Sequence, residues 1–296
     1  MRNIRAVATL IVTVIFGTGL VILTKETKST PMVRTIPNNS QEVAPSILPT
    51  PTPTPLPTLV VTSTPKPLSF TEMNQKYGPC VYLPTLLYHH IQNLDTAKTQ
   101  GHQSLTVSPE FFRKQMEYVK DHGYTPIAPN MLINFFDSGA GLPKKPILLT
   151  FDDGYQDFAT DAAPILKEFG FTAIAFIPTG LMNNPGYMNW DTLSSLSPTM
   201  YMANHTWSHH TVAASKDVIE KEITVADTQL SQHNLNALKV FAYPYGNANS
   251  FAIEQLKKLG YKLAYTTRPG STLCKSQRFE LPRTRIGNAQ LSGYGL

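Results

Sequence analysis

The sequence contains little cysteine. Cys80 and Cys274 are the only two in a chain of 296 residues. No pattern around either residue indicates a thiolate nucleophile, and neither lies near the N-terminus, where a lipid anchor would be attached. In an exported protein the pair allows one disulfide that joins the two ends of the folded region. The alternative is that both remain buried thiols.

The sequence also lacks a concentrated basic surface. Its 25 Lys and Arg residues against 20 Asp and Glu give a formal net charge of +5 and a pI near 9.0. These residues are scattered, with no basic stripe interleaved with aromatics, so we expect no nucleic-acid binding. A mild positive charge outside the cell is compatible with anionic envelope polymers, and equally with solubility alone.

The N-terminal stretch lacks charge over a length that suits a bilayer. Residues 6–24 carry no charged side chain and follow Arg2 and Arg5; at about 1.5 Å per residue such a helix crosses most of the hydrocarbon core. We therefore predict a membrane segment over residues 1–28. It has no Ala-x-Ala cleavage site, which favours a retained single-pass anchor with the rest of the chain outside the cell. The alternative is a cleaved signal peptide and a secreted protein.

Proline and threonine dominate the next part of the chain. Residues 29–69 include the alternating run from Pro49 to Pro55. Such a composition cannot bury enough apolar surface to fold, so we predict a disordered and extended linker. It would hold a folded domain, residues 70–296, away from the membrane, as an enzyme that works on a surface polymer requires.

Short apolar segments alternate with helical ones across the predicted domain. Apolar runs predict strands at 83–88, 125–127, 146–151, 171–177, 200–203, 239–243, 261–265 and 281–286, and helical patterns cover 108–120, 131–136, 161–169, 215–233 and 251–259. About seven strands that alternate with helices imply parallel pairing and an α/β fold, either a barrel or a doubly wound sheet. The active site is then expected at the C-terminal ends of the strands.

Two adjacent carboxylates follow the most apolar of these strands. Asp152 and Asp153 come directly after residues 146–151, and side chains diverge at a strand end, so the two can hold different roles. One can bind a metal ion while the other accepts a proton. Two carboxylates so close together also favour a nearby cation, because both must otherwise remain charged side by side. Paired acids on a solvated loop are the common alternative.

Two histidines supply possible partners for the carboxylates. His205 and His209 lie four residues apart just past another strand, close enough to bind one ion, and neutral imidazole is a common zinc ligand. A pair of surface histidines would give the same spacing. Together with one Asp they would form an Asp-His-His set that leaves positions open for water and substrate.

A Pro/Gly turn follows a third strand. The sequence from Tyr243 to Gly246 reads Tyr-Pro-Tyr-Gly, which is a turn by composition. At a strand end such a turn can present a backbone N–H to an oxyanion, as hydrolysis of an amide or ester requires.

These three pieces, in this order, resemble the polysaccharide deacetylase family with its NodB homology domain. The matching segments are Thr150-Phe151-Asp152-Asp153-Gly154, His205-Thr206-Trp207-Ser208-His209 and Pro244-Tyr245-Gly246, within roughly residues 80–290. The resemblance implies a distorted (β/α) barrel that removes acetyl groups from N-acetylated sugars. Carried over by position, the metal ligands would be Asp153, His205 and His209. Asp152 would be the general base, the Tyr245 backbone N–H the oxyanion donor and Thr206 a support for the ligands.

The sequence departs from the family pattern at two places. The third motif usually begins with an arginine that orients the base, and here that position is Ala242. We expect Arg283 or Arg285 to replace it from the last strand, and prefer Arg283; an ordinary surface ion pair is the alternative. The late Leu-x-His motif that usually supplies the general acid is also missing, since no histidine follows His233.

An early histidine is the expected replacement for that acid. The segment Leu87-Tyr88-His89-His90-Ile91 is similar to the Tyr-His-x-Ile of the branch that acts on poly-β-1,6-N-acetylglucosamine. We therefore predict His89 as the general acid, with His90 as the alternative. Tyr243, Tyr245 and Trp190 are predicted to contact the sugar, although a buried tryptophan is equally compatible with the sequence.

The resemblance and the residues together predict a metal-dependent N-deacetylase of an extracellular N-acetylglucosamine polymer. Zn²⁺ is preferred because two imidazoles and one carboxylate suit it, with Co²⁺ or Ni²⁺ as alternatives. Other possible substrates are peptidoglycan, chitooligosaccharides or acetylated xylan, and a non-catalytic glycan-binding domain is the rival of another class. We expect a monomer that contacts the membrane only through its N-terminal segment.

Overall fold

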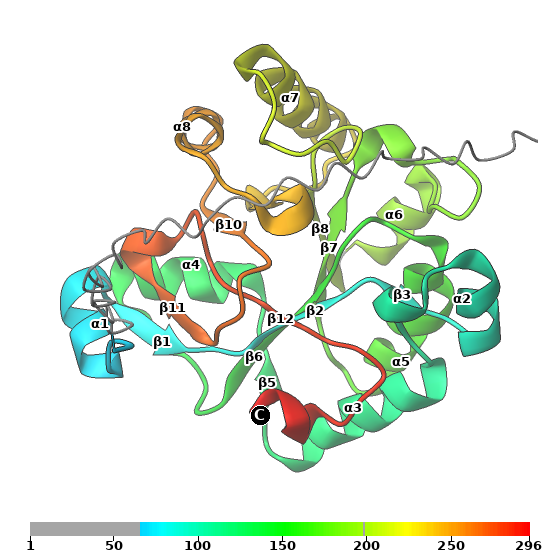
Figure 1. Cartoon of the computed structure of the whole chain (residues 1–296), viewed down its shortest axis with the longest axis horizontal. Coiled ribbons are helices and arrows are strands. Elements are labelled where there is room, and N and C mark those ends of the chain that lie inside the picture. The colour runs from blue at the N-terminus through cyan, green and yellow to red at the C-terminus, as the bar shows by residue number, and fades with distance from the viewer. Residues whose placement is uncertain (1–65, 198) are drawn as a thin grey trace, which may run out of the picture. The chain divides into compact units, whose positions relative to one another are not determined.

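The computed structural model describes residues 66–197 and 199–296 (Figure 1). The predicted membrane segment at residues 1–28, and the predicted linker up to residue 65, lie outside the described residues. Within the described ranges, no helix is both long and apolar enough to cross a membrane. The described chain enters helix α1 (Phe70–Tyr77), where Ser69 and Glu72 cap each other's backbone N–H groups.

The centre of the domain is a sheet of parallel strands. Along the sheet the strands follow the order β10 (Leu263–Tyr265), β9 (Val240–Ala242), β8 (Met200–Asn204), β7 (Ala173–Ile177), β6 (Pro146–Phe151), β2 (Thr85–Tyr88) and β12 (Thr284–Arg285). The short strand β5 (Thr125–Pro126) pairs with the start of β6. All these pairings are parallel, as the alternation of strands and helices predicted.

An irregular segment links the two edges of this sheet. Leu281 forms a parallel bridge to Tyr265 at the end of β10, and the Thr266 N–H donates to the Leu281 carbonyl at 2.8 Å. Three residues later the same segment becomes β12 and pairs with β2. The arrangement fits a distorted (β/α) barrel. It brings Arg283 between β10 and β2.

Helices cover the outside of the sheet because each strand alternates its side chains. In β6, Ile147 and Leu149 join one apolar cluster with helix residues such as Phe112 and Leu166, while Leu148 joins a second cluster with residues of neighbouring strands. The same alternation puts Thr150 and Asp152 on the inner side with Leu148. The position of Asp152 inside the barrel mouth is therefore set by the register of one buried strand.

The remaining helices follow the strands in chain order. Their bounds are α2 (Leu94–Gln100), α3 (Pro109–Asp121), α4 (Pro129–Ser138), α5 (Ala163–Glu168), α6 (Trp190–Leu196), α7 (Lys216–Gln232) and α8 (Ser250–Lys258). Helix α3 begins as its sequence predicts: the Ser108 hydroxyl accepts from the Phe111 N–H at 3.2 Å, and Pro109 occupies the first turn. Short 3-10 or π turns are η1 (Gln103–Leu105), η2 (Phe158–Ala162), η3 (Thr179–Leu181), η4 (Pro244–Gly246), η5 (Lys275–Gln277) and η6 (Leu291–Tyr294).

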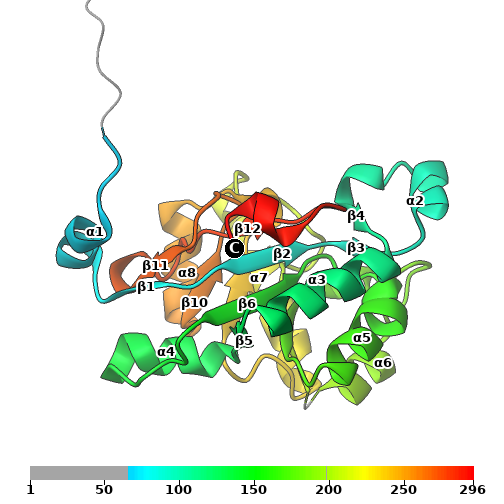
Figure 2. The ribbon, with the colours of Figure 1, turned by 90° about the horizontal axis from the view of Figure 1, so that it is seen from below.

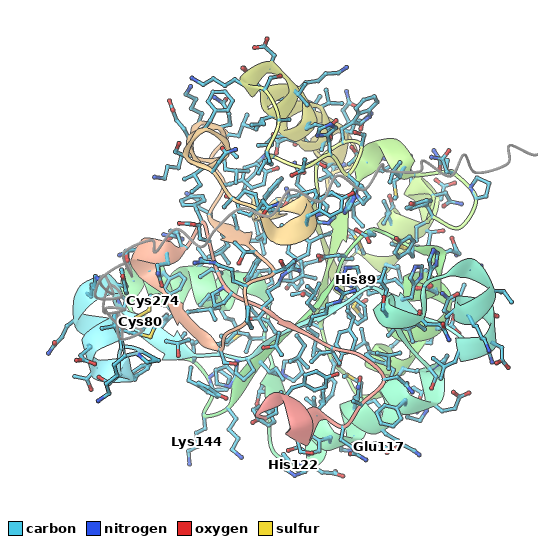
Figure 3. All side chains as sticks on the ribbon, in the orientation of Figure 1. Cys80, His89, Glu117, His122, Lys144 and Cys274 are labelled. Carbon is cyan, nitrogen blue, oxygen red and sulfur yellow. A yellow bond between two sulfur atoms is a disulfide. The ribbon has the colours of Figure 1, made fainter. Side chains whose placement is uncertain are left out.

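Two small two-stranded sheets flank the barrel. Strand β1 (Cys80–Tyr82) pairs antiparallel with β11 (Thr272–Cys274), and β3 (His90–Ile91) pairs with β4 (Thr106–Val107). Figure 2 shows β1, β11 and α1 on one flank of the domain and β3, β4 and α2 on the other. Cys80 and Cys274 are directly opposed in register and form a disulfide (Figure 3). Of the two alternatives that the sequence left open, a disulfide or two buried thiols, the structure has the disulfide.

Several predicted boundaries need correction. The predicted strand at 281–286 is regular only over Thr284–Arg285, because the preceding residues bond to β10 and not to β2. The predicted helix at 161–169 starts earlier, as a π turn from Phe158 that continues into α5. Helices α1, α2 and α6 were not predicted.

The disulfide gives the first testable prediction. It links residues 194 positions apart, so its loss frees a long loop in the unfolded chain. The Cys80→Ser/Cys274→Ser variant should lose about 2–5 kcal/mol of unfolding free energy relative to the oxidised protein, measured by urea denaturation. Reductant should lower the stability of the wild type and leave the variant unchanged. Equal unfolding midpoints for the oxidised wild type and the variant would contradict the prediction.

Candidate active site

Asp152 and Arg283 form a buried ion pair at the mouth of the barrel. Arg283 Nη1 donates to Asp152 Oδ1 and Nη2 donates to Oδ2, both at 2.7 Å. The guanidinium is fully buried, and it also donates from Nε to the Thr266 carbonyl at 2.9 Å and from Nη1 to Thr150 Oγ1 at 3.2 Å. Of the two predicted alternatives, the structure places Arg283 on Asp152. Arg285 donates only to the Ser104 carbonyl, at 3.4 Å.

The ion pair keeps Asp152 ionised despite its burial. Burial by itself raises the pKa of the Asp152 carboxyl. The Arg283 charge, its hydrogen bonds and the nearby His205 lower the pKa by more than burial raises it, so the net pKa lies below the usual value. Both carboxylate oxygens accept from Arg283, which fixes the plane of the group.

Asp153 turns toward the two histidines. Its backbone has φ of 75°, an uncommon conformation for a residue other than glycine. Asp153 Oδ1 lies 3.3 Å from His205 Nε2 and 3.0 Å from His209 Nε2. Burial alone would raise the pKa of Asp153, but the two imidazoles beside its carboxylate hold the pKa well below the usual range. Asp152 and Asp153 therefore serve different neighbours, as their positions at a strand end predicted.

His205 is held by the strand next to its own. Its Nδ1 lies 2.8 Å from the Ala242 carbonyl, so Nδ1 carries the proton and donates, and Nε2 points toward Asp153 with a free lone pair in the neutral ring. Burial lowers the pKa of His205, but the charges of Asp152 and Asp153 outweigh that effect and the net pKa is raised. Without a bound cation, the cluster would stabilise the imidazolium form.

The three predicted ligands fit a metal ion. Each of Asp153, His205 and His209 offers one ligand atom, and these atoms lie within 4.8 Å of one another. Asp153 Oδ1 is buried without a hydrogen-bond partner of good geometry among the described residues. A buried carboxylate oxygen that faces two imidazole nitrogens is the donor set that a divalent cation such as Zn²⁺ requires.

Uncommon backbone conformations concentrate at this cluster. Besides Asp153, positive φ angles occur at Thr206 (68°), His209 (58°) and Tyr245 (60°). Such conformations cost free energy and persist only where the surrounding structure enforces them. Thr206 is the residue predicted to support the ligands. Its backbone N–H donates to Asn204 Oδ1 at 2.8 Å, and its hydroxyl has no partner among the described residues.

A buried glutamate on helix α7 holds the histidine loop. Glu222 Oε2 accepts from the N–H groups of Trp207 at 3.1 Å and Ser208 at 2.8 Å, and Oε1 accepts from the Ser208 hydroxyl at 2.6 Å. These contacts fix the two residues between Thr206 and His209. Sequence reasoning missed Glu222 because it is one of several acids on an amphipathic helix, and only its burial distinguishes it.

The two adjacent histidines after β2 have different surroundings. His89 lies near both Asp152 and Asp153; burial lowers its pKa, although the two carboxylates act in the opposite direction. His90 turns away and contacts Asp157, with 2.5 Å between Nδ1 and Oδ2. The structure therefore places His89, and not His90, beside the candidate base.

Of the three residues predicted to contact the sugar, only Tyr245 is exposed. Tyr245 is 66% exposed and packs edge-on against His209, with ring centroids 4.9 Å apart. Tyr243 is fully buried and its hydroxyl donates to the Phe279 carbonyl at 3.0 Å. Trp190 stacks on His233 at the end of α7, with centroids 4.0 Å apart. The predicted sugar contact of Tyr243 needs correction, because its ring is buried; that of Trp190, which is partly exposed, stays a prediction.

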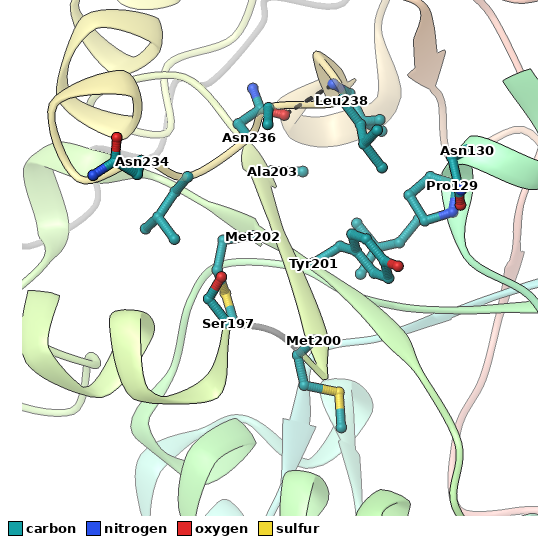
Figure 4. A pocket seen from close by; sticks show the side chains of 14 residues that line it. Pro129, Asn130, Ser197, Met200, Tyr201, Met202, Ala203, Asn234, Asn236 and Leu238 are labelled. Atoms are coloured by element: carbon teal, nitrogen blue, oxygen red, sulfur yellow. Dashed lines mark hydrogen bonds between the residues drawn. The ribbon is translucent and has the colours of Figure 1, made fainter.

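A separate cavity of about 370 Å³ lies at the other end of the strands (Figure 4). It is lined by the start of β8, including Met200 and Tyr201, and by residues from Asn234 to Leu238. None of the predicted site residues lines it. Because the chemistry of parallel α/β folds lies at the C-terminal strand ends, this cavity is not the candidate active site.

Comparison with known proteins shows which families and structures this chain is similar to. The family model described as polysaccharide deacetylase matches residues 139–264, a range that contains the predicted metal ligands and Asp152. Residues 139–264 are therefore similar in sequence to polysaccharide deacetylases.

The chain is also similar to individual proteins of known name. The chain is 29% identical over 247 residues to the poly-β-1,6-N-acetyl-D-glucosamine N-deacetylase of Escherichia coli K12, covering 68% of this chain but only 36% of that protein. It is 25% identical to the Staphylococcus aureus MRSA252 protein of the same name, covering 63% of this chain and 69% of that one. The chain thus spans about a third of the length of the E. coli protein.

Solved structures share the fold. The Streptococcus pyogenes deacetylase PplD, determined in complex with acetate, has a TM-score of 0.65 and 29% identity, covering 70% of this chain and 93% of that one. IcaB from Ammonifex degensii has a TM-score of 0.62 and 20% identity, covering 72% and 94%. At that identity IcaB supports the fold alone.

The Arg283–Asp152 pair gives a prediction about stability and pH. Arg283→Met leaves a buried carboxylate without its partner, so we expect a loss of about 3–5 kcal/mol of unfolding free energy at pH 7. Because the folded-state pKa of Asp152 is lowered, the pair stabilises the protein above the unfolded pKa of about 3.9, and this contribution disappears as the pH falls through the folded pKa. Urea denaturation with chelator present, at several pH values, measures the difference.

The control for this pair is the neighbouring arginine. Arg285→Met should change the unfolding free energy by less than about 0.5 kcal/mol, because the side chain is exposed. The loss in Arg283→Met should also be smaller in an Asp152→Asn background. A full loss in that background would show that Arg283 acts through packing and not through Asp152.

Glu222 gives a prediction about metal affinity. Glu222→Ala removes the acceptor for the loop between the two histidines, so we expect binding of Co²⁺ to weaken about 10- to 100-fold, measured by calorimetric titration. Glu222→Gln keeps one oxygen acceptor and should lose less. Glu220→Ala, on the exposed face of the same helix, should bind Co²⁺ as the wild type does. Unchanged affinity in a folded Glu222→Ala protein would contradict this positioning role.

Proposed function

We propose that this domain is a metal-dependent N-deacetylase that hydrolyses acetamido groups of a poly-β-1,6-N-acetylglucosamine-type polysaccharide. The main support for the proposal is that the two aspartates contact different groups. Asp153 faces His205 and His209, whereas Asp152 is hydrogen-bonded to Arg283. Cation binding alone would not require a second, oriented carboxylate. The names of the relatives support the choice of substrate.

A divalent cation would be held by Asp153, His205 and His209, where it would act as a Lewis acid on the acetyl carbonyl and on water. Zn²⁺ is the preferred ion because two imidazoles and one carboxylate suit it. Co²⁺ and Ni²⁺ accept the same ligands.

Asp152 is the proposed general base. Its ionised form is favoured by Arg283, and its Oδ2 lies 3.9 Å from His205 Nε2, which places the carboxylate next to the ligand set without making it a ligand. A base must be unprotonated and within reach of the attacking water. Arg283 supplies both conditions, because it lowers the pKa of Asp152 and fixes the carboxylate plane.

His89 and Tyr245 are proposed to complete the reaction. His89 would give a proton to the departing amine from the side of β2, and the Tyr245 backbone N–H would donate to the oxyanion. Tyr245 lies in a sharp turn after β9 and has a positive φ, an uncommon backbone conformation that is often found at functional sites. The exposed Tyr245 ring beside His209 offers a surface for the sugar.

The predicted cellular arrangement stays part of this proposal. The substrate polymer is extracellular, so we propose that residues 1–28 anchor the protein in the membrane and that the Pro/Thr-rich linker extends the domain outward as a monomer. Cleavage within the first segment would instead release a secreted enzyme. Fractionation of cells that express the full chain separates these two forms.

The test is acetate release from poly-β-1,6-N-acetylglucosamine by the purified protein. We expect activity that a chelator removes and that Zn²⁺ or Co²⁺ restores. Asp152→Asn should lower turnover by at least about 100-fold, while binding of Co²⁺ is kept. Arg285→Met serves as the matched control and should stay active.

The same assay separates the rival functions. Acetate release from peptidoglycan, chitooligosaccharides or acetylated xylan, and not from the β-1,6 polymer, would keep the chemistry and change the substrate. Activity that survives Asp152→Asn would refute the assigned base. A folded, metal-loaded protein that binds the polymer but releases no acetate would instead be a glycan-binding domain.

A further inference from the structure

A second cavity, of about 510 Å³, lies beside the candidate catalytic residues. Its lining includes His90 and Gln92 from one segment and Tyr155 and Asp157 from another. These two segments continue directly from His89 and from Asp153 in the chain. Tyr155, which lines the cavity, lies beside Asp153, so the cavity is close to the proposed reaction centre. Its volume suits a small-molecule or single-residue ligand.

Three polar atoms in this cavity are buried without a partner. Among the described residues, His90 Nε2, Gln92 Nε2 and His102 Nδ1 have no hydrogen-bond partner, and all three residues line the same cavity. The His90 residue is only 4% exposed. Buried polar groups are normally satisfied, because an unmade hydrogen bond costs free energy. Three in one cavity leave hydrogen-bonding positions that a ligand or ordered water can fill.

The chemistry of these atoms favours a neutral, hydroxylated ligand. His90 Nδ1 contacts Asp157 Oδ2, and the remaining nitrogen, Nε2, accepts in the neutral ring and donates in the imidazolium, whereas an amide NH₂ such as that of Gln92 is a donor. Sugar hydroxyls both donate and accept, and so match this mixture. A phosphate or carboxylate only accepts, no Lys or Arg lines the cavity, and Asp157 is acidic.

Aromatic rings add flat surfaces to the same cavity. The His90 ring lies between Tyr155, with centroids 3.7 Å apart, and His102, with centroids 4.6 Å apart. Tyr155 also packs on Tyr187 at 5.3 Å. This stack fixes the His90 ring in orientation, and the Asp157 hydrogen bond fixes its tautomer. The polar groups are therefore preorganised, which lowers the entropic cost of binding.

We propose that this cavity is a sugar-binding subsite for the residue next to the one being deacetylated. The inference rests on the proposed function, since it assumes a polymer whose reacting sugar lies at Asp152 and His89. Gln92 and His102 bind hydroxyl or acetamido groups of the neighbouring sugar. They are positioning residues for polymeric substrates, and they take no part in the hydrolysis itself.

The test compares a polymeric and a sugar-free substrate. Gln92→Ala and His102→Ala in the full chain should lower kcat/KM for a β-1,6-N-acetylglucosamine pentamer by about 10-fold, through loss of one hydrogen bond each. Hydrolysis of 4-nitrophenyl acetate, which has no sugar to place in the cavity, should stay unchanged. Equal losses on both substrates, or no loss on the pentamer, would overturn the subsite.

Matched controls lie outside the cavity. Gln103→Ala and His122→Ala replace the same residue types at exposed positions, and neither lines the cavity; Figure 3 places His122 at the far edge of the domain from His89. Both controls should behave as the wild type. If one test variant fails to fold, the other still decides the question.

A binding measurement separates failure of the subsite from failure of the proposed function. Calorimetric titration of the pentamer into Asp152→Asn protein, with and without Gln92→Ala, does not depend on acetate release. A protein that releases no acetate but loses about 10-fold in pentamer affinity on Gln92→Ala keeps the subsite and loses the deacetylase proposal. Equal affinity with and without Gln92→Ala overturns the subsite in either case.

Discussion

The bidentate ion pair between Arg283 and Asp152 is the interaction on which the rest of the site depends. It requires the irregular segment near residue 283 to lie between β10 and β2, and it requires Asp152 to point inward from the end of β6. Burying two charges is costly unless their geometry is good and their remaining hydrogen bonds are made. Here Thr150 and Thr266 accept two further N–H donors of Arg283, so each guanidinium nitrogen has a partner, and Asp152 stays ionised.

The different contacts of Asp152 and Asp153 follow from this ion pair. With both oxygens of Asp152 occupied by Arg283, only Asp153 is free to face His205 and His209. The histidine loop is in turn held from outside by Glu222 and from the next strand by the Ala242 carbonyl. Positive φ angles at Thr206 and His209 are the conformational cost of this arrangement.

Much of this arrangement could be predicted from the sequence because it depends on strand ends and local motifs. The apolar run before Asp152 predicts a buried strand, and the spacing of His205 and His209 predicts a shared partner. The position of Ala242 suggested a missing orienting group, and the structure gives that residue a different use, since its carbonyl accepts from His205. Arg283 was predicted as the replacement by its place in the last strand.

Features that depend on contacts distant in sequence could not be predicted in the same way. Glu222 resembles its exposed neighbours on α7 until the helix is packed against the histidine loop. Trp190 and Tyr243 carry aromatic rings that suit a sugar, yet neighbouring elements bury or stack them. The cavity around His90 is lined by residues from three separate segments, so no local sequence pattern predicts it.

We propose that the two adjacent aspartates hold separate roles, Asp153 as metal ligand and Asp152 as base. Titration of Co²⁺ into wild-type, Asp152→Asn and Asp153→Asn proteins, followed by calorimetry, tests it most directly. We expect one bound ion in the wild type and in Asp152→Asn, and loss of that ion in Asp153→Asn. Loss of binding in Asp152→Asn with binding retained in Asp153→Asn would contradict it.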